Sequence, residues 1–534
     1  MAQLAGIDWV ILVGYVFVTL AIGVKFSGRI HTAEDYFLGD RSIPWWALGL
    51  SVLATYVGAM TFLGAPAWAY DEGLAILLIH INYPIAIFFV CVVFIPFFYD
   101  SGSASIYDYL EKRFGGQTRL LMASVFLFGN LIYSGIMLYT TSLLLSYIAP
   151  ISVPVAILLV ALFALSYTLL GGLNAVVWTD VVQSFVLLLG ALSVLFFLLL
   201  GFEGNMGSLY GDLQSAGTLD IMKTSLDPEV TATLWTGIVA MSIYHVVVYG
   251  VNQMMVQRTL AAKTIGDAKK AFAFMGYAAF FVFLLMFAIG ILLGDHYAGQ
   301  AFDNKNTIIL TYIDELAVPG LLGLIAAAVL ASAMSSLDSS LNSMATVSTL
   351  DFYQRFSKKP CSPEKALVVT RLFTVFWGMA VLVPAFTVLG WGGSVLELLS
   401  KIGSFFVGAK LSCYGLGFFS RNANERGILV GVAASFTVLW WVASYTQVAW
   451  PWYAVIGGLV SLIVGWLASL ALEGRRHEWH PYSVPGRRRM FAERGLPTHE
   501  SGWSLMPGSV DRALLGLPLF FVVSLGALLV LTTL

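Results

Sequence analysis

The sequence is poor in charged residues and in cysteine, and both shortages narrow the class of protein. Asp, Glu, Lys and Arg make up 11% of its 534 residues, whereas soluble proteins carry about 25%. Its 3 cysteines lack the spacing of a disulfide framework or a zinc site. The sequence also lacks a nucleotide-binding loop, a paired catalytic motif and a recognisable soluble signalling domain. We therefore expect neither an enzyme nor an ATP-driven pump, and no nucleic-acid partner.

The sequence is instead rich in long hydrophobic runs, and 59% of its residues are hydrophobic. A run of about 20 mostly apolar residues is long enough to cross a bilayer as a helix. Fourteen such runs predict an all-α polytopic membrane protein with 14 transmembrane helices. The predicted spans are 7–25, 44–65, 74–98, 118–149, 152–172, 176–202, 232–257, 271–293, 319–352, 367–390, 394–419, 427–446, 451–471 and 513–533.

The placement of positive charge predicts an orientation in the plasma (inner) membrane. If the N-terminus is outside and the spans alternate, nearly all of the 28 Lys and Arg fall in inside loops, as the positive-inside rule requires. An even number of spans then puts both termini on the extracellular or periplasmic side. The first apolar run lacks the features of a cleaved signal peptide, so we expect it to be retained. The Arg-rich inside loop 473–511 is expected to contact anionic lipid.

One membrane segment carries more hydroxyl groups than a lipid-facing helix would need. Between Leu321 and Thr349, serines recur at a spacing that places them on one helical face, flanked by Asp338 and Asn342. Clustered hydroxyls beside a carboxylate suit a hard monovalent cation, although serines also pack helices closely and bond to their own backbone. We favour the cation site, because ionisable residues inside membranes are usually functional. The serines are Ser332, Ser335, Ser336, Ser339, Ser340 and Ser343.

Two other spans are interrupted by glycine among polar side chains. Gly58 follows Thr55 and Tyr56 in the second span, and Gly250 precedes Asn252 in the seventh. A broken membrane helix must line a cavity, because its freed carbonyl groups cannot face lipid. Those carbonyls can bind a cation, and the ends of the half-helices can hold a solute. The two interruptions are five spans apart, which predicts two five-helix repeats, inverted relative to each other.

The chain resembles the sodium/solute symporters, the family of the sodium/glucose, sodium/proline, sodium/sialate and sodium/monocarboxylate carriers, over about residues 36–427. The resemblance is carried by Asp35-Tyr-Phe-Leu-Gly39 with Trp45-Trp46, Tyr109-Leu-Glu-Lys-Arg-Phe114, Gly171 through Gln183, Asn252-Gln253 through Gln257-Arg258, and the serine helix. It implies a LeuT-type five-plus-five inverted-repeat core. The implied divisions are 1–43 (one extra helix and a loop), 44–202 (first repeat), 203–231 (an outside loop), 232–419 (second repeat) and 420–534 (three further helices).

The resemblance also implies which residues bind sodium. The first site would take carbonyl oxygens of Ala54 and Val57 and oxygens of Ser332, Ser335 and Ser336. Some members have a second sodium site, whose counterparts here are Asp180, Ser335, Ser336, Asp338 and Ser339. The family often has serine or alanine at position 338, so Asp338 either strengthens a second cation site or accepts a proton. Asp180 has an alternative role as a polar cap near the inner interface.

The solute-binding residues do not carry over intact from the family. Positions that bind the hexose in a sugar carrier hold His245, His80 and Ala279, and the sialate-binding arginine aligns with Tyr133. Aromatic rings and neutral donors suit a sugar or polyol, whereas Lys401 would pair either with a solute carboxylate or with Glu397. The role of Lys410 stays open, and the two histidines have an alternative role in helix packing. The predicted lining residues are Tyr56, Thr61, His80, Tyr133, His245, Tyr249 and Lys401.

The function expected from these features is sodium-coupled import of a small polar solute, a sugar or sugar derivative, by alternating access. One sodium ion is required, or two if the second site binds. Sodium- or proton-coupled uptake of a carboxylate such as sialate or a monocarboxylate is the alternative. A channel would need a continuous polar pore, whereas the polar residues here concentrate at mid-depth. We expect no obligate protein partner beyond the lipid bilayer.

Overall fold

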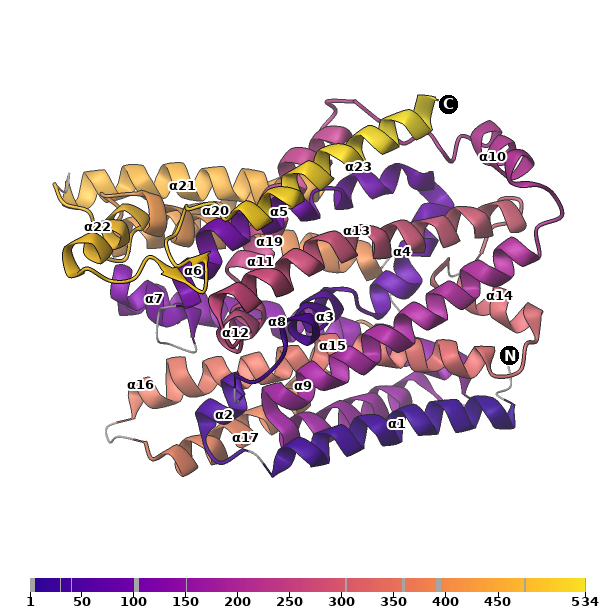
Figure 1. Cartoon of the computed structure of the whole chain (residues 1–534), viewed down its shortest axis with the longest axis horizontal. Coiled ribbons are helices and arrows are strands. Elements are labelled where there is room, and N and C mark those ends of the chain that lie inside the picture. The colour runs from indigo at the N-terminus through magenta and orange to yellow at the C-terminus, as the bar shows by residue number, and fades with distance from the viewer. Residues whose placement is uncertain are drawn as a thin grey trace.

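The computed structural model describes residues 5–28, 30–39, 41–99, 105–149, 151–302, 305–357, 361–389, 395–474 and 477–533. Its long helices lie side by side along one axis, and both described chain ends lie at the same end of the bundle (Figure 1). Among the described residues, 11 helices are long and apolar enough to cross a membrane, or up to 12 if a bent pair counts as one span. The protein is therefore a helical, multi-pass membrane protein, and the count of fourteen spans stays a prediction.

The first half of the chain contains one very long helix, α9 (Val153–Leu200). Its elements are α1 (Gly6–Ser27), α2 (Ala33–Leu38), α3 (Trp45–Tyr56), α4 (Ala59–Glu72), η1 (Gly73–His80), α5 (Tyr83–Phe89), η2 (Val90–Phe94), α6 (Ile95–Tyr99), α7 (Ile106–Arg113), α8 (Gly116–Ile148), α9 (Val153–Leu200) and α10 (Met206–Ser215). The spans expected at 152–172 and 176–202 form the single element α9, which departs from helical geometry at Gly172 (φ 53°). A side chain there would come within 3.0 Å of the Tyr36 carbonyl oxygen, so both the backbone and the packing favour glycine.

The second half begins with another bent helix and ends with a helix on the outside of the bundle. Its elements are η3 (Thr236–Met241), α11 (Ser242–Gly250), α12 (Gln253–Leu260), α13 (Ile265–His296), η4 (Lys305–Thr307), α14 (Ile308–Leu316), α15 (Leu321–Val347), η5 (Ser348–Tyr353), α16 (Gln354–Phe356), α17 (Pro363–Ala380), α18 (Leu382–Thr387), α19 (Val395–Phe419), α20 (Glu425–Tyr445), α21 (Pro451–Glu473), α22 (Val484–Arg494), β1 (His499–Glu500), β2 (Trp503–Ser504), η6 (Arg512–Leu515) and α23 (Gly516–Thr533).

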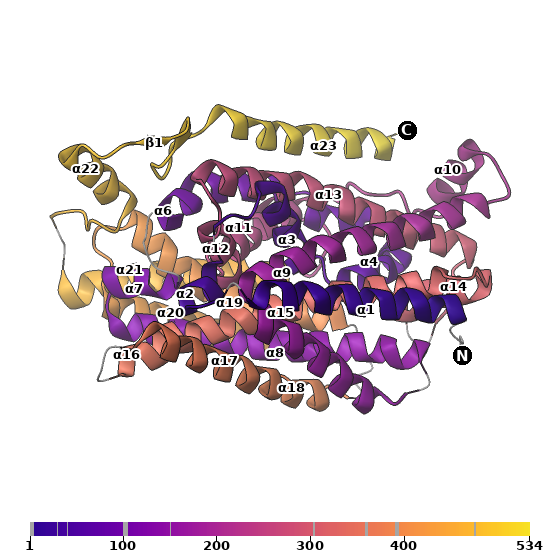
Figure 2. The same cartoon turned by 60° about the horizontal axis from the view of Figure 1, so that its bottom comes forward.

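The serine helix α15 lies in the middle of the bundle rather than against lipid. It packs against α9, α8, α1 and α17, and Figure 2 shows it among these helices. Nearly all of its described side chains are buried, including the hydroxyl-bearing face. The polar stripe therefore faces other helices, as a functional stripe in a membrane protein must.

The described part of the basic segment 473–511 contains regular secondary structure, and its contact with anionic lipid stays a prediction. It folds into α22 and the antiparallel hairpin β1–β2, which lie at the end of the bundle away from both termini (Figure 1). Lys269 at the start of α13 is fully buried, and its Nζ donates to Asp511 at 2.6 Å. The Glu500 carboxylate accepts the Ile265 amide at 2.9 Å, at the positive end of the α13 dipole. Lys269, which the sequence places in an inside loop, is thus buried, and its ion pair with Asp511 joins this segment to α13.

Candidate cation and solute sites

The break between α3 and α4 lies directly against the serine helix. Helix α3 ends at Tyr56, and Val57 takes a non-helical conformation (φ −85°, ψ 74°) before α4 begins. Ser336 Oγ donates to the carbonyl oxygen of Thr55 at 2.9 Å, and Ser335 lines the same crevice as Ala54 and Val57. Four of the five residues predicted for the first sodium site therefore converge. The fifth, Ser332, lies on α15, but its side chain is outside the described side chains.

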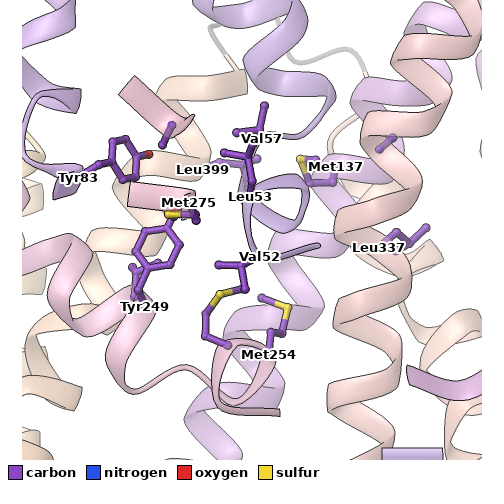
Figure 3. Close-up of a cluster of buried hydrophobic side chains, with 14 of the residues drawn as sticks. Val52, Leu53, Val57, Tyr83, Met137, Tyr249, Met254, Met275, Leu337 and Leu399 are labelled. Atoms are coloured by element: carbon purple, nitrogen blue, oxygen red, sulfur yellow. The ribbon is translucent and has the colours of Figure 1, made fainter. Parts of the chain in front are cut away.

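Buried apolar side chains surround this break. Figure 3 shows Val52, Leu53 and Val57 around the break, with Met137 and Leu337 drawn from neighbouring helices. All five side chains are buried. Electrostatic interactions are stronger where water is excluded, so oxygen atoms exposed at the break would attract a cation more strongly than they would in water.

Asp180, predicted for a second sodium site, already holds a positively charged partner. Its carboxylate accepts hydrogen bonds from Ser51 and Ser335 and forms an ion pair with Arg258 at 3.0 Å. The exposed fractions of the Arg258 and Asp180 side chains are 1% and 0%. A buried carboxylate needs such a partner, because an isolated charge inside the protein is very unfavourable. Sequence reasoning treated Arg258 as an inside-loop charge, and the Gln257-Arg258 pair in the family motif was the one signal of its role.

The other residues of the predicted second site are only partly gathered around Asp180. Ser339 Oγ accepts a hydrogen bond from Arg258 at 2.7 Å, so it belongs to the same network. Asp338 instead accepts the Tyr167 hydroxyl at 2.9 Å, and Ser336 is directed to the first break. The set therefore forms an Arg258-centred network with Asp338 at its edge.

Two further serines of the stripe join helices instead of facing the break. Ser340 accepts the Ser134 hydroxyl at 2.7 Å, linking α15 to α8. Ser343 donates to the side-chain oxygen of Gln257 on α12. Both interpretations of the serine pattern thus apply, each to different serines: some contact the region of the break, and others satisfy polar groups between packed helices.

Six of the seven predicted solute-binding residues line one small cavity of about 120 Å³. They are Tyr56, Thr61, His80, Tyr133, His245 and Tyr249. Lys401 does not line it: its side chain is exposed, although its neighbour Ser400 is on the cavity wall. The prediction that Lys401 lines the cavity was wrong, because α19 turns the preceding residue toward the cavity. The alternative partner Glu397 has its side chain outside the described side chains.

The cavity combines stacked rings with fixed polar groups. The His80 ring stacks on Phe283 at a centroid distance of 3.7 Å, and Tyr83 stacks on His245 at 4.2 Å. His245 Nδ1 lies 2.5 Å from the side-chain oxygen of Asn82, which fixes the orientation of its ring. Sequence reasoning missed Asn82 and Tyr83, because neither carries a motif of its own.

Two buried side-chain atoms of the cavity lining have no hydrogen-bond partner among the described residues. They are His80 Nδ1 and Trp450 Nε1, and both are buried. Most buried polar groups in proteins are hydrogen-bonded, so such atoms in a cavity wall are candidates for contact with a bound molecule. Trp450 lies far from the other lining residues in sequence and could not be predicted from spacing.

The arrangement is similar to that of known transport proteins. Residues 36–434 match the model of the sodium:solute symporter family. The chain is 31% identical to the sodium/sialic acid symporter NanT of Aliivibrio fischeri over 475 residues, 87% of this chain and 93% of that protein. It is 30% identical to the sodium/glucose cotransporter of Vibrio parahaemolyticus, over 81% of this chain and 84% of that protein. The structure of a substrate-bound, outward-open Na⁺-coupled sialic acid symporter matches with a TM-score of 0.80 and 28% identity, covering 89% of this chain and 100% of that chain.

Proposed function

The chain belongs to the sodium:solute symporter family and is a sodium-coupled symporter, and we propose that it imports a small, uncharged, sugar-like solute. Members of this family are transporters, and the role proposed for the cavity is binding rather than catalysis. The observation that carries the proposal is the composition of the cavity wall. None of the described residues that line it is Lys, Arg, Asp or Glu.

A wall of aromatic rings and neutral polar groups favours a polyhydroxylated solute. Rings such as Tyr56 and His80 can pack on the apolar face of a sugar, while Thr61 and Ser400 offer hydroxyl groups. A carboxylate would lose its hydration without gaining a cation from this wall, which is strongly unfavourable. Sialate remains the second candidate, because NanT of Aliivibrio fischeri is a sialic acid symporter.

We propose one sodium ion at the first break as the coupling ion. Its ligands would be the carbonyl oxygens of Ala54 and Val57 with oxygens of Ser332, Ser335 and Ser336. The contact between Ser336 and the Thr55 carbonyl supports this set, because it brings α15 to the break. For a second ion to use Asp180, the Arg258 guanidinium would have to move or share the carboxylate, so we propose that this site is secondary.

The proposed coupling runs through two consecutive residues. The Thr55 carbonyl faces the ion region, while the next side chain, Tyr56, lines the solute cavity. An ion that holds the break against α15 would therefore also fix Tyr56 in the position that completes the cavity. Each sodium ion crossing a potential of about 100 mV supplies about 2.3 kcal/mol to drive the solute inward. Rocking of one repeat against the other would then release the sodium ion and the solute on the inner side.

We also propose fourteen spans with two inverted five-helix repeats, 44–202 and 232–419, and both termini outside the plasma membrane. Helical elements on every expected range support the count. The two chain ends at one end of the bundle support an even number of crossings (Figure 1). Labelling of single cysteines introduced in loops of intact cells would test the orientation.

Uptake into proteoliposomes tests the function. Purified protein should accumulate a labelled solute when an inward sodium gradient is applied, and replacement of sodium by choline should abolish uptake. A panel of labelled sugars, polyols, sialic acid and short carboxylates should give the highest sodium-dependent uptake with a neutral sugar or polyol. Uptake driven by a pH gradient alone would favour the proton-coupled alternative, and single-channel currents would favour a channel.

A further inference from the structure

Gln183 on α9 carries a buried hydrogen-bond acceptor without a partner. Its side chain is 1% exposed, and its Nε2 donates to the Tyr15 hydroxyl on α1 at 3.3 Å. Among the described residues nothing donates to its Oε1. An amide oxygen buried in a membrane protein without a partner is unfavourable. A retained orphan acceptor therefore points to a bound group that the protein atoms do not supply.

The position of Gln183 indicates that the bound group is a cation. It lines the crevice of about 590 Å³ that also contains Ala54, Val57 and Ser335. It lies one helical turn after Asp180, whose carboxylate accepts the Ser335 hydroxyl. The neighbouring Ser184 is already satisfied, because its hydroxyl donates to the Asp180 carbonyl at 2.8 Å. The Gln183 oxygen is thus a buried, unpaired acceptor on a residue that lines the same crevice as residues of the first cation site.

We propose that Gln183 Oε1 is a further ligand of the sodium ion at the first break, oriented by Tyr15. This inference rests on the proposed position of that ion. An amide oxygen is a hard, neutral donor of the kind that alkali and alkaline-earth cations accept. The hydrogen bond from Nε2 to Tyr15 fixes the orientation of the amide and leaves Oε1 to accept from another group. The ion would then connect α9 with α3 and α15. Helix α1, which precedes the repeats, would position the Gln183 ligand of the ion through Tyr15.

Substitutions at this position separate coordination from packing. Gln183→Leu removes the oxygen at similar volume, Gln183→Glu keeps an oxygen and adds negative charge, and Tyr15→Phe removes only the orienting hydroxyl. Ser184→Ala is the matched control, because it lies on the same turn and its hydroxyl bonds mainly to its own helix at 2.8 Å, with a longer contact of 3.5 Å to the Leu50 carbonyl. The measurement is the sodium concentration that gives half-maximal solute uptake in proteoliposomes, together with the solute KM at saturating sodium.

We expect Gln183→Leu to raise the half-saturating sodium concentration by about tenfold, as loss of one ligand would. Gln183→Glu should leave that concentration unchanged or lower it, and Tyr15→Phe should raise it by a smaller factor than Gln183→Leu. The solute KM at saturating sodium should change little in all of them, and Ser184→Ala should match the unmodified protein in both measurements.

The outcomes distinguish this inference from the function on which it rests. If choline abolishes uptake by the unmodified protein but Gln183→Leu has an unchanged sodium dependence, Gln183 is not a ligand and the symport assignment stands. If uptake by the unmodified protein is the same with and without sodium, the proposed function itself is wrong. Should Gln183→Leu not fold, Gln183→Glu decides: sodium dependence as strong as in the unmodified protein supports coordination, and a clear weakening overturns it.

Discussion

The two broken helices each carry a glycine among polar residues but satisfy their freed backbone groups in different ways. At the first break, the Thr55 carbonyl is reached by Ser336 from another helix, and the adjoining crevice contains Ala54 and Val57. At the second break, Asn252 caps α12, and its side-chain oxygen accepts the Met254 amide at 3.0 Å. The first break therefore depends on a group from another helix, whereas the amide of Met254 at the second break is satisfied within its own chain segment.

The second break also supports the first. The Asn252 amide donates to the Tyr56 hydroxyl at 2.8 Å, and the rings of Tyr56 and Tyr249 meet edge-on at 5.2 Å. Farther along α12, Arg258 donates to the Ser51 hydroxyl on α3 at 2.8 Å. Asn252 and α12 thus hold α3 at two points, Tyr56 and Ser51, near the region proposed for sodium. This difference teaches that a glycine among polar residues marks a break without saying which partner completes it.

The largest effect should come from cutting the connection through Arg258. Arg258→Met leaves Asp180 as a buried charge without a cation, which costs about 3–5 kcal/mol of stability. Thermal unfolding of the purified protein should show a large loss of stability, and uptake should fall with it. The double variant Arg258→Met with Asp180→Asn should recover part of the stability, because it removes the orphaned charge. Equal stability of the single variant and the unmodified protein would show that the pair does not hold the two helices together.

The next effect should be at the first break itself. Ser336→Ala removes the hydroxyl that reaches the Thr55 carbonyl, so the half-saturating sodium concentration should rise by about tenfold or more. Ser340→Ala is the matched control on the same helix, because that hydroxyl pairs with Ser134 instead. It should change sodium dependence by less than about threefold. Similar shifts in both variants would mean that the serine face acts as a whole and that the break is not special.

Much of this comparison could be predicted from the sequence, because it depends on local signals. Gly58 and Gly250 marked the two breaks, and the serine spacing marked the face of α15 that meets the first one. Six of the seven predicted cavity residues line one cavity, because they either lie beside the two breaks or occupy positions that bind the solute in related carriers. The sodium ligands and the inverted repeat stay predictions.

The remaining contacts depend on distant segments that no local pattern connects. Arg258 looked like a loop cation, yet the fold buries it against Asp180, 78 positions earlier in the chain. Trp450 lines the solute cavity, and Asn82 orients the His245 ring of its wall, although the two lie far apart in the chain. Their roles follow from tertiary packing, which a single sequence does not specify. The prediction for Lys401 was wrong for a related reason, because the side of α19 that faces the cavity depends on how that helix packs.

A smaller effect should follow from loosening the contact between the two breaks. Tyr56→Phe removes one hydrogen bond, that from Asn252, worth about 1 kcal/mol, and keeps the ring in the cavity wall. We expect the solute KM to rise by about fivefold, with a smaller change in sodium dependence. Tyr70→Phe is the control, since its hydroxyl bonds to the Gln300 carbonyl, away from both breaks. A larger change in sodium dependence than in solute KM would place Tyr56 on the ion side of the coupling.

The smallest effect should come from the glycine at the second break, and it tests why that residue is there. A side chain at Gly250 would come within 2.9 Å of the Phe94 ring, so Gly250→Ala requires the ring to shift and should cost about 1 kcal/mol of stability. Gly14→Ala is the control: Gly14 lies in α1 with nothing within 4 Å of the added carbon, and alanine there should be neutral or slightly stabilising. Thermal unfolding separates the two. If Gly250→Ala is as stable as Gly14→Ala while transport falls, Gly250 is needed for movement at the second break. The second break would then not be a static support of the first.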